Sequence, residues 1–315
     1  MKAPSPIPHL SEDLLISLNI DTQDIIAMME TVIRGGEAGT VWSAPKSFMT
    51  PPDGRYVMAT LAAIDEPPLV VTKSLVLNER NLEQGLPQIN GLVSLLHGQT
   101  GLPVATVDNN WVTAVRTAGL SAVAAKYMAN ENAASIGFIG AGVQAQSHLD
   151  AFKAMFPLER VKIFGRGQKN IDRLAASATN AGLKVQVCET AQQALEEVAL
   201  AVTSVTHTGV SGPFLRANWL SPGAFVSAVD LGVPWHKESF SVLDKLAVDD
   251  LKQEAALPNK LADPAHVHGD LADLVHGRVK GRANAQDRTA FVFRGHALGD
   301  LALAVLAYQR FSGHA

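Results

Sequence analysis

The chain has 315 residues, of which 47% are hydrophobic and 18% charged, and its formal net charge is -4 at pH 7. A chain without a basic block offers no surface for nucleic acid, and no run approaches the roughly 20 apolar residues that cross a membrane. We therefore expect the protein to bind neither nucleic acid nor a membrane. The length predicts two domains or one domain split by an insertion.

The first segment with helical periodicity follows Asp21, a residue type that often caps helix N-termini. Apolar residues recur there every three or four positions, which is typical of an amphipathic helix. The pair Gly35-Gly36 is expected to end it. The apolar stripe consists of Ile25, Ile26, Met29, Val32 and Ile33.

Four strand-like runs follow without a helix between them, which predicts an antiparallel sheet. The segment Gln99-Thr100-Gly101 joins the last two as a hairpin turn. An alanine-rich helix over residues 110–129 then leads out of this sheet. The runs span residues 55–64, 69–77, 91–96 and 102–107.

Beyond residue 130 strands alternate with helices, which predicts an α/β fold with a Rossmann-type doubly wound parallel sheet. A last helix covers residues 297–311. Strands are expected at 134–139, 161–164, 184–188, 199–205 and 224–229, with helices from about 143, from about 169 and over 191–198.

A glycine turn stands between the first of these strands and its helix. Gly140 permits a tight turn, Gly142 lets the backbone approach a pyrophosphate, and Ala145 is small enough for the helix to pack on the strand. The free N–H groups of the helix N-terminus favour an anion. We expect a dinucleotide to bind the whole turn, Gly140-Ala141-Gly142-Val143-Gln144-Ala145.

The second strand of this unit ends in Gly165-Arg166-Gly167, where an NAD-specific site carries an acidic residue. The planar guanidinium of Arg166 suits a 2′-phosphate, so NADPH is favoured and NADH remains possible; a solvated loop arginine is the alternative. Thr206 and His207 follow another strand end, and we assign both, with Thr117, to the cofactor site; for His207, simple exposure at the end of the strand is the alternative.

Two cations occupy apolar surroundings in the first part of the chain: Lys73 within an expected strand and Arg116 within an expected helix. Burying a charge costs several kcal/mol unless it is paired or meets an anionic ligand. A substrate carboxylate would provide that partner, and an internal salt bridge is the alternative.

At these residues the chain resembles the ornithine cyclodeaminase/mu-crystallin family. The similarity rests, in order, on the strand around Lys73, on Thr100-Gly101-Leu102-Pro103-Val104-Ala105 and Asp108, on Thr113-Ala114-Val115-Arg116-Thr117-Ala118, and on the glycine turn. It implies a homodimer with an α+β substrate-binding and dimerisation domain over residues 1–117 and 296–315. The dinucleotide-binding domain would span residues 118–295, and Lys73 and Arg116 would hold the substrate carboxylate.

Three positions depart from the family pattern. Lys46 replaces a further carboxylate-binding arginine, and it keeps the charge without the bidentate fork. Gly232 stands where cyclodeaminases carry an aspartate, and the nearest carboxylate is Asp230, which is either catalytic or a structural turn residue. Phe293-Arg294-Gly295 replaces a lysine-serine pair before the last helix.

The resemblance and these departures favour reduction of a C=N bond over cyclodeamination. We expect an NAD(P)H-dependent ketimine reductase that converts cyclic imino acids such as Δ1-pyrroline-2-carboxylate to amino acids. Water, Lys73 or Asp230 would protonate the imine nitrogen. An ornithine cyclodeaminase, an amino acid dehydrogenase and a non-catalytic binding protein of mu-crystallin type are the alternatives.

Cys188 is the only cysteine, which rules out an internal disulfide and favours the cytoplasm. We interpret it as a buried structural thiol. The His266-Val267-His268 run is interpreted as a surface loop, and no metal site is expected.

Overall fold

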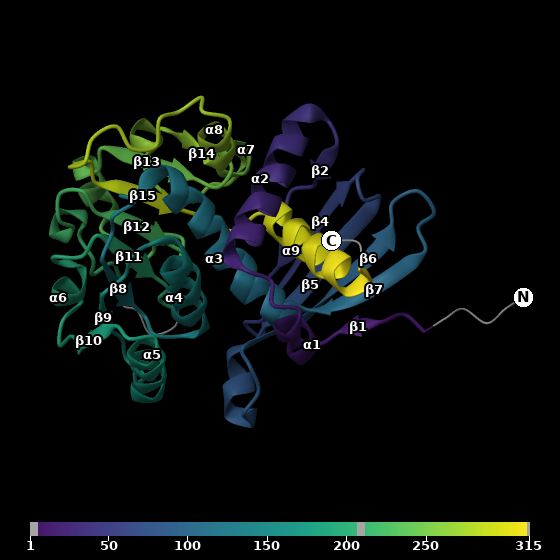
Figure 1. Ribbon diagram of the computed structural model, residues 1–315, viewed down its shortest axis with the longest axis horizontal. Coiled ribbons are helices and arrows are strands. Elements are labelled where there is room, and N and C mark those ends of the chain that lie inside the picture. The colour runs from purple at the N-terminus through teal and green to yellow at the C-terminus, as the bar shows by residue number, and fades with distance from the viewer. Residues whose placement is uncertain (1–5, 207–211, 314–315) are drawn as a thin grey trace, which may run out of the picture. The chain divides into compact units, whose positions relative to one another are not determined.

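The computed structural model describes residues 6–206 and 212–313 (Figure 1). The chain forms two compact units. The first contains Met1–Gly119 and His296–Ala315, and the second contains Leu120–Gly295. The boundary between them falls within helix α3, Asn109–Met128.

The first unit is built on a seven-stranded sheet of order β1-β7-β6-β5-β4-β2, with β3 paired to β4. The predicted antiparallel pairing is confirmed for its four long strands, and β1 joins β7 in parallel. The strands are β1 (His9–Leu10), β2 (Val41–Ser43), β3 (Ser47–Met49), β4 (Tyr56–Ile64), β5 (Leu69–Leu77), β6 (Ile89–His97) and β7 (Pro103–Asp108).

Strand alternation gives this sheet one buried and one partly exposed face. Helix α9, Ala297–Ser312, contacts β4 and β5, and it also packs against helix α2, Thr22–Ala38. Thr60 of β4 and Lys73 of β5 are buried register partners. The strands therefore place the polar side chains of these residues in the core of the first unit.

The predicted end of α2 is wrong, because the helix continues through Gly35-Gly36 to Ala38. Gly39 ends it in the left-handed conformation, with φ 75°. Gly35 instead permits a close approach of β2, since a Cβ there would lie 2.5 Å from Cγ2 of Val41.

The second unit is a Rossmann-type doubly wound α/β fold, as predicted. Its eight strands follow the order β10-β9-β8-β11-β12-β15-β13-β14, and all neighbours are parallel. The strands are β8 (Ser135–Ile139), β9 (Arg160–Phe164), β10 (Lys184–Val187), β11 (Leu200–Thr203), β12 (Phe225–Ala228), β13 (Lys245–Val248), β14 (Gly269–Asp270) and β15 (Thr289–Val292).

Helices α4 (Val143–Met155) and α5 (Gln168–Asn180) contact each other, while α6 (Ala191–Leu195) packs on β8 and β9. Right-handed crossovers put α6 on the opposite face from α4 and α5. A Cβ on Gly137 would lie only 2.0 Å from the carbonyl oxygen of Ala194, so glycine permits this packing.

Several elements differ from the sequence expectation. Helix α6 ends at Leu195, before the expected 198, because the chain turns at Glu197 with φ 58°. The strands β13, β14 and β15 were not predicted. The remaining elements are α1 (Glu12–Ser17), α7 (Leu251–Ala256), α8 (Leu271–Val275) and the 3-10 helices η1 (Glu79–Gln84), η2 (Ala217–Trp219), η3 (Lys237–Val242) and η4 (Pro264–His266).

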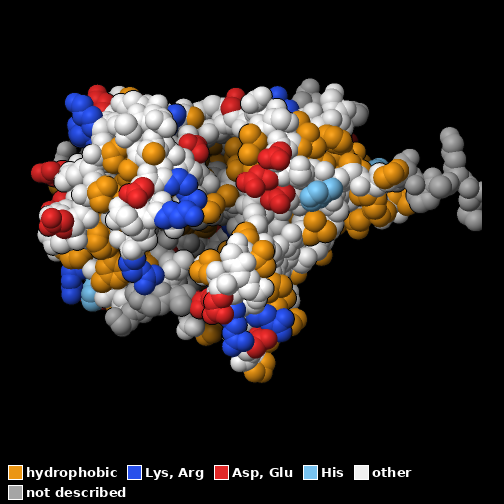
Figure 2. All heavy atoms as spheres, turned by 90° about the horizontal axis from the view of Figure 1, so that it is seen from below, with side chains coloured by type: hydrophobic (Ala, Val, Ile, Leu, Met, Phe, Trp, Pro, Cys, Tyr) orange, Lys and Arg blue, Asp and Glu red, His pale blue; other side chains and the backbone are white. Residues whose placement is uncertain are grey.

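On the face that Figure 2 shows, Lys and Arg side chains stand in small groups interspersed with Asp and Glu. None of the helices in the described ranges has the length and apolar character needed to cross a membrane. Cys188 is buried, and this burial raises the pKa of its thiol.

Candidate functional site

The second unit contains a pocket of about 510 Å³ at the carboxyl ends of three parallel strands. Strand β8 neighbours both β9 and β11, so the chain leaves it in one direction and later returns on its other side. Ligands of open α/β sheets bind at such a switch point. The lining residues are Ile139, Gly140, Ala141, Gly142, Phe164, Gly165, Arg166, Gly167, Asn170, Ser204, Val205, Thr206, Gly212, Pro213 and Phe214.

The glycine turn forms one wall of this pocket. Gly140 has φ 95°, and a Cβ there would lie 2.7 Å from the carbonyl oxygen of Ser204. Gly142 caps α4, and a Cβ on it would meet no protein atom within 4 Å. Ala145 is fully buried, whereas Val143 is exposed. The turn therefore leaves open space directly before a helix N-terminus, as an anion site requires.

Arg166 and Thr206 lie on the same pocket wall, and an Arg166 terminal nitrogen donates a 3.3 Å hydrogen bond to Thr206 Oγ1. The other strand-end residue of the prediction, His207, lies outside the described residues. Thr117 belongs to the first unit, where its hydroxyl donates to the carbonyl of Thr113 at 2.7 Å.

Sequence reasoning missed two polar residues of the pocket, Ser204 and Asn170. Among the described residues, the Ser204 Oγ atom is buried and has no hydrogen-bond partner, so its hydroxyl is available to a ligand. Its position directly after a buried strand is the signal that could have identified it.

In the first unit, Lys73 and Arg116 meet at one carboxylate that sequence reasoning did not identify. Lys73 Nζ lies 2.6 Å from Asp300 Oδ1, and Arg116 Nε lies 3.2 Å from the same oxygen. The side chains of Lys73, Arg116 and Asp300 are 0%, 11% and 3% exposed. The internal salt bridge, left open as an alternative, is therefore present.

This cluster carries two cations and one carboxylate. Burial, followed by the repulsion of Arg116, lowers the pKa of Lys73 to about 8, although Asp300 counteracts the shift. Burial raises the pKa of Asp300, but Lys73 and Arg116 outweigh burial and hold that pKa below its usual value. At neutral pH all three groups are charged, which leaves the trio one positive charge in excess.

Two threonines complete the cluster. Thr60 Oγ1 donates to Asp300 Oδ2 at 2.9 Å, and Lys73 Nζ lies 3.4 Å from Thr113 Oγ1. Lys46, directly before β3, adds positive charge that further lowers the Lys73 pKa. The structure thus gathers three predicted substrate-binding cations in the first unit, and their excess charge suits an organic anion.

The comparison with known proteins decides the family. The model of the ornithine cyclodeaminase/mu-crystallin family matches residues 9–315. The chain belongs to this family. Ketimine reductase mu-crystallin of Rattus norvegicus is 30% identical over 81% of this chain and 80% of its own length. Alanine dehydrogenase of Archaeoglobus fulgidus is 29% identical over 73% of each chain.

Solved structures of the ornithine cyclodeaminase/mu-crystallin family have the same fold. The Thermococcus litoralis Δ1-pyrroline-2-carboxylate reductase, solved with NADH and L-proline, is 25% identical with a TM-score of 0.89, and the match covers 98% of both chains. An archaeal alanine dehydrogenase dimer with bound NAD is 25% identical with a TM-score of 0.86, covering 98% of this chain and 97% of its own.

Asp230, the carboxylate nearest the cyclodeaminase aspartate position of this family, makes the contacts of a turn residue. It is buried after β12, and its two oxygens accept from Thr203 Oγ1 and from the Val205 amide, each at 3.1 Å. These bonds tie the end of β12 to the end of β11. The predicted catalytic role of Asp230 stays a prediction.

Replacing Asp230 with asparagine should change how stability depends on pH. Burial raises the Asp230 pKa to about 6 in the folded protein, above the roughly 3.9 of an unfolded aspartate. The protonated group therefore stabilises the fold below about pH 4, and this contribution is lost as the pH rises through about 6. From about pH 4 to pH 7 the wild type should lose about 3 kcal/mol relative to Asp230→Asn. Urea unfolding at successive pH values measures this, and parallel curves would contradict it.

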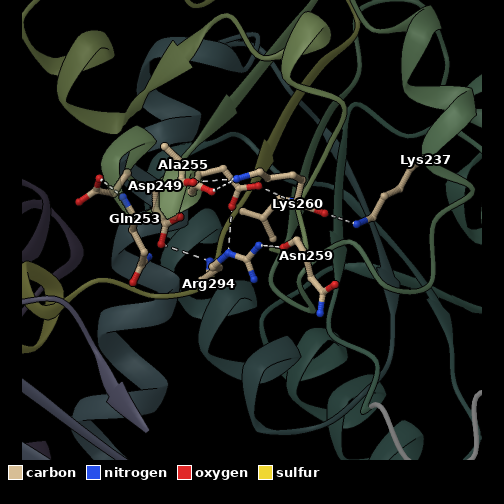
Figure 3. A network of polar contacts seen from close by, with 10 residues as sticks. Lys237, Asp249, Gln253, Ala255, Asn259, Lys260 and Arg294 are labelled. Carbon is tan, nitrogen blue, oxygen red and sulfur yellow. Dashed lines mark hydrogen bonds and ion pairs between the residues drawn. The ribbon is translucent and has the colours of Figure 1, made fainter. Parts of the chain in front are cut away.

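The family departure at Arg294 also has a structural explanation (Figure 3). Arg294 Nε lies 2.9 Å from Glu254 Oε2, its amide donates to Asp249 Oδ2 at 3.2 Å, and a terminal nitrogen donates to the carbonyl of Asn259. The Lys260 ammonium donates hydrogen bonds to the carbonyls of Glu254 and Ala255, in the last turn of α7. Arg294 therefore anchors residues 249–261 within the second unit.

Proposed function

We propose that this protein uses NADPH to reduce the C=N bond of small cyclic imino acids, such as Δ1-pyrroline-2-carboxylate, to amino acids. The observation that carries the proposal is the buried Lys73–Asp300–Arg116 cluster with its excess positive charge. It accompanies a dinucleotide-type pocket in the same chain. The second unit thus has a pocket that suits a nucleotide, and the first has a cationic cluster that suits an organic acid. These are the two reactants of such a reduction.

The residues of the second unit fit a dinucleotide. The turn at Gly140 and Gly142 would hold the pyrophosphate against the N-terminus of α4, with Val143, Gln144 and Ala145 forming the first helical turn. The hydroxyls of Ser204 and Thr206 would donate hydrogen bonds to the nucleotide. When bound, a reduced nicotinamide supplies the hydride that the imine carbon accepts.

The cations of the first unit would bind and orient the substrate. Lys73 and Arg116 would hold its carboxylate, and Lys46 would add long-range attraction. Fixing the carboxylate restricts the rotation of a small ring, which is how positioning contributes to the rate. Water, Lys73 or Asp230 would then deliver a proton to the imine nitrogen.

Relatives support this choice of reaction. The Thermococcus litoralis reductase of the same fold was solved with NADH and L-proline, the reduced form of this imino acid. Gly232 at the cyclodeaminase aspartate position argues against cyclodeamination, because that reaction needs a group to handle protons at the amine.

NADPH is proposed because of Arg166. Replacing Arg166 with alanine should weaken NADPH binding about tenfold or more and change NADH binding little, since only NADPH carries the 2′-phosphate. Fluorescence titration with both nucleotides measures this. Arg160→Ala, at the opposite end of β9 with an exposed side chain, is the matched control. Equal losses for the two nucleotides would count against the assignment.

The alternatives separate by their chemistry. A ketimine reductase oxidises NADPH when cyclic imino acids are added, whereas an alanine-dehydrogenase-type enzyme also needs ammonia with its keto acid. A cyclodeaminase releases ammonia from ornithine. A binding protein of mu-crystallin type binds NADPH and turns over none of these substrates, and that result would overturn the proposed reaction.

We also propose that residues 1–117 and 296–315 form a substrate-binding and dimerisation domain, and that residues 118–295 bind the dinucleotide. The sheet of the first unit has apolar side chains on its partly exposed face, among them Leu61 and Leu92, at 47% and 42% exposure. A homodimer would cover such a face. The archaeal alanine dehydrogenase of the same fold is a dimer.

A further inference from the structure

Asp300 reaches the carboxylate site from the far end of the chain. It lies on α9, 227 residues from Lys73, and its side chain is almost fully buried. Both of its oxygens are engaged within the first unit: Oδ1 by Lys73 and Arg116, and Oδ2 by the hydroxyl of Thr60. Asp300 therefore faces the cations of the site, and as an ionised carboxylate, which only accepts hydrogen bonds, it has no donor to offer a substrate carboxylate.

These contacts leave N–H groups of both cations for a further anion. The Lys73 ammonium has three protons, of which Asp300 and Thr113 can accept two. Arg116 turns its Nε toward Asp300 at ion-pair distance. Among the described residues no ion pair or hydrogen bond involves its terminal nitrogens, so the fork that grips carboxylates bidentately stays available.

We propose that Asp300 is a positioning residue of the substrate site, one that holds Lys73 and Arg116 so that their remaining N–H groups converge on the substrate carboxylate. This inference rests on the proposed reductase function. It assigns to α9 a part in substrate binding, although Asp300 does not touch the substrate.

A merely structural carboxylate and a positioning carboxylate differ in their effect on Lys73. The charged and polar groups that face its ammonium are Asp300 from α9, Arg116 and Thr113 from α3, and Lys46 from the segment before β3. In the part of the chain that the structure describes, Asp300 is the one negative group at ion-pair distance from this ammonium. Asp300→Asn should therefore lower the pKa of Lys73 further, so that the ammonium is lost at a lower pH.

The test is the affinity of the NADP+-loaded protein for pyrrole-2-carboxylate, a planar cyclic acid. Calorimetry measures this affinity at successive pH values from about pH 6 to pH 10. For the wild type, affinity should fall as Lys73 loses its proton. Asp300→Asn should bind about tenfold more weakly, and its fall in affinity should occur about one pH unit lower. NADP+ affinity should be unchanged, and in turnover KM should rise more than kcat falls.

Thr60→Val keeps the two ion pairs and removes one hydrogen bond to Asp300. It should weaken the binding of pyrrole-2-carboxylate about threefold. This second variant serves as the test if Asp300→Asn does not fold. Asp150→Asn, on the exposed side of α4, controls for the substitution itself. Unchanged affinity and an unchanged pH profile in a folded Asp300→Asn would overturn the inference. Where that variant does not fold, unchanged affinity in Thr60→Val would overturn it. A wild type that binds no carboxylate would overturn the proposed function itself.

Discussion

Replacing Lys73 with methionine should lower kcat/KM for a cyclic imino acid about a thousandfold. The substitution keeps most of the side-chain volume and removes a buried ammonium whose loss leaves Asp300 with one cation. Removing one member of a buried charge pair between a protein and its ligand costs about 2–5 kcal/mol of binding, and every 1.4 kcal/mol is about a factor of ten in an equilibrium or rate. Steady-state kinetics with NADPH held at saturation measure the loss.

NADPH affinity should stay within about twofold in this variant, because Lys73 belongs to the other unit. Lys153→Met, at an exposed position of α4, is the matched control and should behave as wild type. Unchanged turnover in Lys73→Met would refute the role of Lys73 in binding the substrate carboxylate.

The second large effect is expected at Gly142. Its backbone, with φ -77° and ψ -162°, suits any residue, and a Cβ there would meet no protein atom within 4 Å. Gly142→Val should therefore fold normally. The added side chain would occupy the space through which a pyrophosphate approaches the helix N-terminus. Losing two charge-assisted hydrogen bonds should weaken NADPH binding about a hundredfold.

Calorimetry with NADPH, together with the melting temperature, separates loss of binding from loss of folding. Gly36→Val is the matched control, because a Cβ on this exposed glycine of α2 also meets nothing within 4 Å. It should bind NADPH like the wild type. If Gly142→Val binds NADPH with wild-type affinity, the pyrophosphate does not lie at this turn.

The features that could be predicted are those whose physical cause is local. The glycine turn, with a buried strand before it and a helix after it, lies within a dozen residues, and the structure places Gly140 and Gly142 on a pocket wall. The long strands around Lys73 and the hairpin at Gly101 likewise follow from alternation and turn chemistry.

What escaped prediction depends on contacts between distant segments. Asp300 is the polar residue among the otherwise apolar buried residues of α9, and its role is visible only when α9 folds onto β4 and β5. A buried lysine implies a buried partner, yet spacing cannot say which carboxylate it is. Gly35 was misread for a similar reason, because the strand that it accommodates comes after the helix ends.

The central claim is that hydride passes from a nicotinamide to the imine carbon of a small organic acid. NADPH carrying deuterium at its transferring position should be oxidised when Δ1-pyrroline-2-carboxylate is added. Mass spectrometry should then find one deuterium on the α-carbon of the proline formed. Nucleotide that stays reduced in the presence of this imine and a panel of other cyclic imino acids would contradict the account.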